Sequence, residues 1–284
     1  MAYVTEEDLA SWSIPIANSE YELAERIMEL VTATTDDLLE GRVATFDVDL
    51  MGSMKNGTAL QDRSDFDVAI TITEPPATLT RSQELDTDSH QRLSLMNHEI
   101  GGGIAGLGGP VDSGFFAHEF EFEGRMVDVV PRTRVAQHDG AVVLFPGGGY
   151  GGYVWNWPAE YEQAIERQDR QTNGNFRETI RVAKGIRRKI SRIADADPIP
   201  SFTLESLLLR VPKSEFRRPL PDRMRAVLAD ARDQTQADDA DQILDPTGRK
   251  PLFGSPLVDL EDSYASLVEM LWLLDHDEPF AYLW

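Results

Sequence analysis

The hydrophobic pattern of this chain changes once, near residues 150–157, and that change constrains the fold more than any other feature. Before it, strand-like runs alternate with helical stretches, whereas after it apolar residues recur only at helical spacing. The helical stretches of the second part are 158–171, 175–194, 203–211, 222–237 and 262–274. The pattern predicts an α+β protein with a mixed α/β lobe at residues 1–155 and a helical lobe at residues 156–284.

The first lobe is expected to combine a long helix with a small mixed sheet. Apolar residues at helical spacing predict a helix to about Leu39, capped by Asn18 or Ser19. The strand-like runs FDVDLM and FDVAITIT flank a turn-rich region, so we expect strand, loop, strand there. A helix over about 82–100 and a loop, GGGIAGLGGP, should follow. The segments FFAHEFEF and MVDVVP, separated by Glu123-Gly124-Arg125, predict a hairpin that adds two strands.

Composition narrows the chemistry that such a chain can perform. It has no cysteine, so a metal would be held by oxygen or imidazole ligands, which favours a hard cation such as Mg²⁺ or Mn²⁺. The formal net charge of −22 repels a polyanion, so we expect no stable DNA binding. The N-terminus is acidic and no apolar run approaches a membrane span. We therefore expect a cytoplasmic protein with no membrane partner.

Three aspartates are candidates for a metal site. Asp65 and Asp67 are two residues apart in an expected strand, which puts both side chains on one face of the sheet. Asp128 lies inside the apolar run VDVV, where strand patterning would place no charge. Carboxylates this close repel one another unless a cation lies between them. Taken alone, an Asp-x-Asp pattern is more typical of solvated strand positions, and we interpret Asp47 and Asp49 in that way, as edge or exposed residues.

A Gly-Ser pair precedes the aspartates and could bind phosphate. Gly52-Ser53 follows the first expected strand, and Gly57-Thr58 lies in the loop before Asp65. Glycine lets a phosphate approach the backbone closely, and Ser53 can donate from its hydroxyl and its amide. An isolated Gly-Ser is equally typical of a tight turn. The order of the motifs, with glycines before the aspartates, favours the phosphate-binding interpretation.

In the helical lobe, five cations recur at intervals of three and four residues and so share one helix face. This basic stripe consists of Arg177, Arg181, Lys184, Arg188 and Arg192. Beside it lies an apolar face of Phe176, Ile180, Ala183, Ile186, Ile190 and Ile193. The stripe could hold a triphosphate or a phosphate-rich acceptor, or it could be a solvated face paired with acidic residues.

Aromatic residues gather at the boundary between the two expected lobes. They are Tyr150, Tyr153, Trp155 and Trp157, set among glycines. Such rings could stack on a nucleobase, although tryptophans at a lobe junction more often pack against the protein itself.

These motifs together resemble a known superfamily, the nucleotidyltransferases with a DNA polymerase β-like core. The string GSMKNGTALQDRSDFDVAI is similar to the Gly-Ser, Gly-Thr, Asp-x-Asp signature of oligoadenylate synthases and of the cGAS/DncV-like CD-NTases. MVDVVP resembles their third-aspartate strand. The segments at 157–188 and 201–212 resemble the arginine-to-lysine helix and the Ser-Phe-x-x-Glu helix that follow. The loop GGGIAGLGGP at Gly101–Pro110 has no counterpart in the pattern.

The resemblance implies a polymerase β-like catalytic core with a mixed sheet, closed by a C-terminal helical lobe. It implies that Asp65, Asp67 and Asp128 are catalytic and bind Mg²⁺ or Mn²⁺. It also implies that Lys184 and Ser201, with Gly52 and Ser53, hold the triphosphate. The activity implied is synthesis of cyclic di- or oligonucleotide signals from nucleoside triphosphates, ATP among them, in anti-phage (CBASS-type) signalling with a downstream effector protein.

Two other functions remain open at this stage. The chain could transfer one nucleotide to an RNA end, a protein or a small hydroxyl compound, and it would then need that acceptor for turnover. It could also be a catalytically silent nucleotide sensor, which the intact set of three aspartates argues against. Archaeal CCA-adding enzymes share the signature but are longer and carry a tRNA-binding tail.

Overall fold

A computed structural model describes residues 4–40, 45–61, 64–80, 85–107, 117–138, 140–144, 154–194, 198–253 and 258–276. Its contacts divide the chain into two compact units. We call Ala17–Asn56 with Arg63–Ala159 the sheet unit, and Met1–Ile16 with Gly57–Asp62 and Glu160–Trp284 the helical unit.

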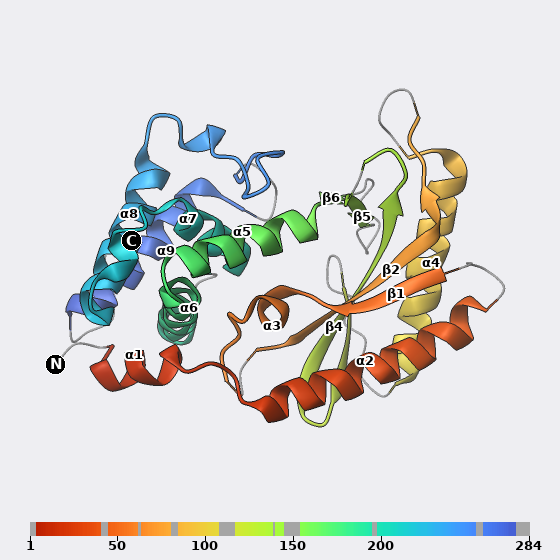
Figure 1. The fold of residues 1–284 in the computed structure, drawn as a ribbon, viewed down its shortest axis with the longest axis horizontal. Helices are drawn as coiled ribbons and strands as arrows, with labels where there is room; N and C mark the ends of the chain where they lie inside the picture. The colour runs from red at the N-terminus through yellow and green to blue at the C-terminus, as the bar shows by residue number, and fades with distance from the viewer. Residues whose placement is uncertain are drawn as a thin grey trace. The chain divides into compact units, whose positions relative to one another are not determined.

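The sheet unit is built on a mixed sheet, as the sequence predicts (Figure 1). Its strands are β1 (Thr45–Leu50), β2 (Phe66–Ala77), β3 (His118–Phe122), β4 (Arg125–Val135), β5 (Val142–Leu144) and β6 (Val154–Asn156). They lie in the order β1-β2-β4-β5-β6, with β3 also paired to β4. Strands β2 and β4 are parallel and every other pair is antiparallel. The sequence analysis did not predict β5 and β6.

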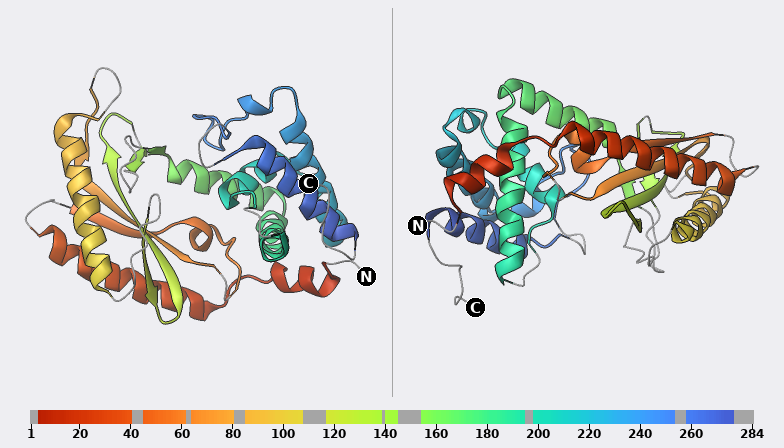
Figure 2. Two further views of the ribbon diagram at one scale, coloured as in Figure 1. Left: turned by 180° about the vertical axis from the view of Figure 1, so that it is seen from behind. Right: turned by 90° about the horizontal axis from the view of Figure 1, so that it is seen from below.

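Two helices cover one face of this sheet. They are α2 (Asn18–Leu39) and α4 (Thr87–Gly106), and both lie next to the strands in the two views of Figure 2. From α2, Glu20 accepts a hydrogen bond from Arg125 at the start of β4. From α4, Asn97 contacts His118 of β3 at 3.0 Å. Because side chains alternate along a strand, this face is the one that carries the buried residues Val127 and Val129.

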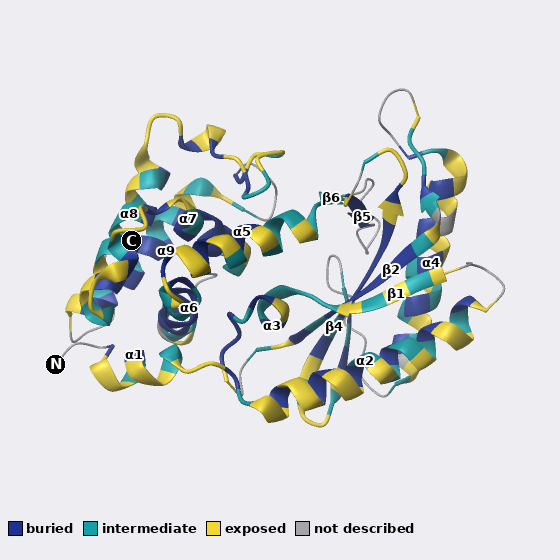
Figure 3. Cartoon of the chain, in the orientation of Figure 1, coloured by how far each residue is buried: buried dark blue, intermediate teal, exposed yellow. Residues whose placement is uncertain are grey.

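The hairpin of β3 and β4 confirms the predicted turn. Glu123 and Gly124 have φ of 50° and 77°, the left-handed backbone that a two-residue hairpin connection requires. A salt bridge from Arg26 of α2 to Glu123 joins the turn to the helix. In Figure 3 the buried residues concentrate on β2 and β4, whereas the edge strand β1 carries exposed positions.

The helical unit contains the helices predicted for the second half of the chain. They are α5 (Pro158–Gln171), α6 (Asn175–Ala194), α7 (Ser201–Arg210), α8 (Leu220–Gln236) and α9 (Leu260–Asp275), with two 3₁₀ turns at Glu215–Arg217 and Ala240–Gln242. The predicted apolar face of α6 is buried from Phe176 to Ile190. None of the helices within the described residues has a segment long and apolar enough to cross a membrane.

A short helix, α1 (Glu6–Ser13), also belongs to the helical unit and was not predicted. Thr5 and Asp8 form a capping box at its start, a signal that the sequence does contain. Val4 and Leu9 join the apolar core of the unit, and Lys189 of α6 forms an ion pair of 2.8 Å with Asp8. Residues 4–16 therefore pack with the helical unit, although the boundary at 155/156 assigned them to the first lobe.

Two predictions about helix ends were wrong. Helix α2 begins after Ala17 with no side-chain cap, so neither Asn18 nor Ser19 caps it. Helix α4 continues to Gly106 rather than ending at residue 100, because glycines allow close packing there. A Cβ at Gly101 would lie 2.6 Å from the His118 ring, and one at Gly103 would lie 2.2 Å from Leu38. Residues 108–110 of the expected loop lie outside the described residues.

Candidate active site

The parallel pairing of β2 with β4 brings two of the three candidate aspartates together. Asp67 and Asp128 are direct partners in the register of the two strands. Asp65 lies two residues before Asp67 and just before β2 begins, so it precedes the strand rather than belonging to it. Because α2 and α4 cover the face that carries Val127 and Val129, the aspartates point from the opposite face. We call this opposite face the aspartate face.

Burial and the neighbouring carboxylates both raise the pKa of Asp128. Burial raises the pKa of Asp128 to about 7, and the charges of Asp67, Glu119 and Asp65 add to the effect. Glu119 is the register partner of Asp128 on β3, so it shares the aspartate face. The sequence analysis did not identify Glu119, although aligning the predicted hairpin strand by strand would have placed it opposite Asp128.

The donor set fits a hard divalent cation. Carboxylate oxygens are the ligands that Mg²⁺ and Mn²⁺ prefer, and Asp128 is close enough to Asp67, Glu119 and Asp65 for their charges to raise its pKa. Within the part of the chain that the structure describes, no three His, Cys, Asp or Glu side chains form a ready-made metal cluster. Binding would therefore require the carboxylates to turn toward the ion.

Gly52 is held against Asp67 by the turn between β1 and helix α3 (Gly52–Asn56). Its φ of +60° is in the left-handed region, and an added Cβ would lie 2.1 Å from Asp67 Oδ2. The amide of Met51 donates to the carbonyl oxygen of Asp67 at 2.8 Å, which fixes the turn beside β2. Only glycine fits here, and the half-buried Ser53 follows it at the start of α3. The Gly-Ser pair thus lies next to the aspartates.

Lys184 lies inside the helical unit, in a polar network with Glu205 and Thr58. It forms an ion pair with Glu205 of α7, and its ammonium group donates to Thr58 Oγ1 at 3.2 Å. Glu205 also accepts hydrogen bonds from Thr58 and from the hydroxyl of Tyr161. Lys184 and Glu205 are 7% and 4% exposed, so this cation is not on a solvated face. Glu205 is the glutamate of the Ser-Phe-x-x-Glu pattern, but neither it nor Tyr161 was assigned a role from the sequence.

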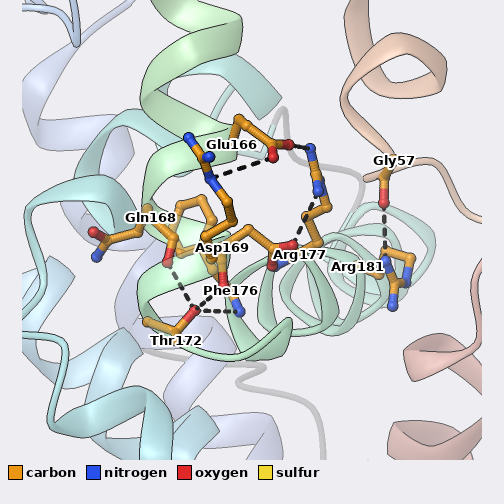
Figure 4. A network of polar contacts seen from close by, with 9 residues as sticks. Gly57, Glu166, Gln168, Asp169, Thr172, Phe176, Arg177 and Arg181 are labelled. Atoms are coloured by element: carbon orange, nitrogen blue, oxygen red, sulfur yellow. Dashed lines mark hydrogen bonds and ion pairs between the residues drawn. The ribbon is translucent and has the colours of Figure 1, made fainter.

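Other members of the stripe have structural partners (Figure 4). Arg177 binds Asp169 at 3.0 Å and Glu166 at 2.8 Å, and its amide donates to Asp169 at 2.9 Å, which caps the start of α6. Arg181 donates to the carbonyl oxygens of Gly57 and Ser13. Of the five, Arg192 is exposed and Arg188 is half-buried. The stripe is thus neither one continuous phosphate-binding surface nor one solvated face.

Ser201 begins α7, one turn before Glu205. Residues four apart share a helix face, so Ser201 lies on the same side of α7 as Glu205, the partner of Lys184.

In the sheet unit, the rings of Trp155 and Trp157 stack at 5.8 Å, and His138 meets Trp155 edge-on at 5.3 Å. The two tryptophans pack on each other, while Tyr150 and Tyr153 lie outside the described residues.

The predicted edge positions are confirmed. Asp47 and Asp49 are exposed on β1, the edge strand of the sheet, and Asp47 forms a 3.0 Å ion pair with Arg134.

Residues 163–274 match the family model of the cGAS/DncV-like nucleotidyltransferase C-terminal helical domain. The matched range contains Lys184, Ser201 and Glu205, and the aspartates and the Gly-Ser turn precede it in the mixed sheet. The helical part of the chain, residues 163–274, is therefore similar to the C-terminal helical domain of the cGAS/DncV-like nucleotidyltransferases.

Members of this family with known products are similar to the chain over most of its length. The cyclic dipyrimidine nucleotide synthase CdnE of Legionella pneumophila is 24% identical over 233 residues, which are 74% of this chain and 78% of that protein. The CdnE c-UMP-AMP synthase of Rhodothermus marinus, solved with Apcpp and Upnpp, has a TM-score of 0.70 and 22% identity, covering 96% of this chain and 95% of its own.

A second solved family member gives the same fold. The CdnE cyclic dinucleotide synthase of Elizabethkingia meningoseptica, solved with GTP and Apcpp, has a TM-score of 0.74 at 16% identity and covers 96% of this chain and 99% of its own. These likenesses confirm the predicted polymerase β-like α+β fold with a C-terminal helical lobe.

Proposed function

We propose that this chain is a metal-dependent synthase that makes cyclic di- or oligonucleotide signals from nucleoside triphosphates. The observation that carries the proposal is the register pairing of Asp67 with Asp128 beside Gly52, in a chain that shares its whole fold with CdnE synthases. The raised pKa of Asp128 supports a cation at this place, because a divalent ion would stabilise the charged form of a buried carboxylate that lies near Asp67, Glu119 and Asp65.

The reaction would join one nucleotide to another and then close the ring. A ribose hydroxyl oxygen forms a bond to the α-phosphorus of a nucleoside triphosphate, and the bond from that phosphorus to the bridging oxygen of the β-phosphate breaks. Pyrophosphate leaves with the electron pair of that bond. A second transfer between the ends of the linear product yields the cyclic one.

The three aspartates would bind the metals, and one of them would also accept a proton. Asp65 and Asp67 would hold two cations, and Asp128 would hold one of them and accept the proton of the attacking hydroxyl. Bound Mg²⁺ or Mn²⁺ would supply positive charge to the phosphate oxygens.

Four residues would hold the triphosphate. Gly52 and Ser53 offer backbone amides and a hydroxyl next to the aspartates. Lys184, which forms an ion pair with Glu205, and Ser201 would hold the β- and γ-phosphates. A cyclic product implies a downstream effector that binds it, and an anti-phage role of the CBASS type follows from the family resemblance.

The test is pyrophosphate release by matched aspartate variants. Asp67→Asn should reduce turnover by about a hundredfold or more, because the variant lacks one of the carboxylates that would bind the metals. Asp36→Asn changes an exposed aspartate on α2 of the same unit, outside the site, and should leave turnover near that of the wild type. Retention of more than about a tenth of the wild-type rate by folded Asp67→Asn contradicts the assignment.

A further inference from the structure

A cavity of about 670 Å³ lies in the sheet unit, beside the aspartates but not among them. Its walls come from β1, β2, β4, β5 and the β4–β5 turn, with Pro158 and Ala159 on one side. Cavities of roughly 300–1,000 Å³ are the size that binds small ligands. No residue of the proposed metal or phosphate site lines it.

The strand register places this cavity on the aspartate face. Thr71 and Arg132, which line it, are direct partners on β2 and β4. Each is four residues beyond its counterpart in the pair Asp67 and Asp128, so all four side chains share one face, about 13 Å apart along the strands. Between the two positions, the partners Ala69 and Val130 are buried, and Val130 packs against Val142 and Leu144. The cavity and the aspartates share one face of the sheet, so a nucleotide whose hydroxyl lies near the aspartates could place its base in the cavity.

The charges that line the cavity are of both signs. Arg132 is buried, and its Nε donates to Thr71 Oγ1 at 2.7 Å, which fixes the plane of the guanidinium group. Arg134 lies on the rim in its ion pair with Asp47. Asp49 also lines the cavity from β1. Two carboxylates would repel a polyphosphate, so the cavity suits a neutral ligand with both donors and acceptors.

Among nucleobases, guanine best matches this lining. Its O6 and N7 are adjacent acceptors for one guanidinium group. Its N1–H and N2–H₂ are adjacent donors for one carboxylate, so guanine can pair doubly with both kinds of group. None of the other three bases has both an adjacent pair of acceptors and an adjacent pair of donors. We propose that the cavity is a base-binding site for the nucleotide whose hydroxyl attacks, and that it selects guanine. This inference rests on the proposed function.

The test measures binding without turnover, using the four ribonucleoside 5′-monophosphates, which cannot release pyrophosphate. GMP should bind the wild-type protein about tenfold or more tightly than AMP, CMP or UMP, the size of one bidentate base contact. Arg134→Gln and Thr71→Val should each reduce this preference by about tenfold, because one removes a rim donor and the other releases Arg132.

Arg26→Gln is the matched control, since Arg26 is another half-exposed arginine in an ion pair with a carboxylate of the same unit, outside the cavity. It should keep the preference for GMP. Equal affinities for the four nucleotides overturn the inference, as does a preference that survives both cavity variants with thermal unfolding unchanged. Failure of the proposed synthase function would appear separately, as no pyrophosphate release from any triphosphate.

Discussion

The raised pKa of Asp128 makes the stability of the folded protein depend on pH. Asp128 lies on a strand whose neighbours are buried apolar side chains, and it is surrounded by Asp67, Glu119 and Asp65. Its pKa of about 7 in the folded protein is above the ordinary value of 3.8. Between these values the folded state keeps a proton that the unfolded state loses, so the free energy of unfolding falls as the pH rises from about 4 to about 7.

We therefore predict that Asp128→Asn is inactive yet more stable than the wild type at neutral pH. The gain should be about 1–2 kcal/mol above pH 7, because solvent reaches part of the carboxylate, and it should vanish near pH 4. Thermal unfolding of both proteins from pH 4 to 8 measures it. Added Mg²⁺ should stabilise only the wild type and so remove the difference in stability between the two proteins. A difference in stability that does not change with pH would contradict its attribution to the pKa of Asp128.

Gly52 offers a second test at the scale of one residue. Gly52→Ala places a methyl group on Asp67 and should displace its carboxylate, with a loss of turnover on the order of a hundredfold. Gly124→Ala is the control, because Gly124 also has a positive φ but no atom within 4 Å of the added Cβ. It should cost only about 1–2 kcal/mol of backbone strain, seen in thermal unfolding, with turnover retained. Equal turnover of the two variants would show that the contact with Asp67 does not matter.

At the scale of elements, periodicity predicted the helices of the second half because each has a buried face of matching spacing. The bounds of α5 and α6 agree with the prediction residue by residue. Short elements were missed: β5 and β6 have three residues each, too few for a periodic signal. The end of α4 was missed because Gly101 and Gly103 look like a loop until His118 and Leu38 are known to pack against them.

Some residues of the candidate site could be predicted from the sequence, and the roles of others could not. The aspartates and Gly52 could be predicted because motif order and strand alternation are local properties of the sequence. The role of Glu205 could not, although the Ser-Phe-x-x-Glu pattern contains this residue, because the role comes from a contact between α6 and α7 that no spacing encodes. The same contact changes the interpretation of Lys184, which the sequence placed on a stripe of like charges and the structure pairs with a buried carboxylate.

This pairing leads to a prediction about α6 and α7. Lys184→Ala should weaken nucleoside triphosphate binding about tenfold or more, the value of a charge-assisted contact, and should also lower the melting temperature by leaving Glu205 without its cation. Arg192→Ala, at an exposed position of the same helix, should do neither. Calorimetric titration and thermal unfolding measure both quantities.

Glu205→Gln separates the two roles of Lys184. It should lower the melting temperature while keeping or raising triphosphate affinity, because the carboxylate no longer competes for the ammonium group. If Lys184→Ala lowers only the melting temperature, the lysine is a structural residue and the phosphate role is wrong.

For the whole molecule, charge and motif placement point to a small, charged substrate rather than a polymer. The formal net charge of −22 opposes a long nucleic acid, whereas nucleoside triphosphates bind where cations and amides are concentrated. The similarity to CdnE synthases extends over 96% of the chain, so both the sheet unit and the helical unit belong to the shared fold.

Acceptor-free synthesis tests the central claim most directly. The purified protein is incubated with the four ribonucleoside triphosphates and Mg²⁺ or Mn²⁺, without RNA, protein or another hydroxyl compound, and the products are treated with phosphatase and identified by mass spectrometry. We predict pyrophosphate release and a phosphatase-resistant cyclic product, because ring closure leaves no terminal phosphate, and we predict neither with Asp67→Asn. Turnover that appears only when an RNA end, a protein or a small hydroxyl acceptor is added would contradict the account and identify a nucleotide-adding transferase.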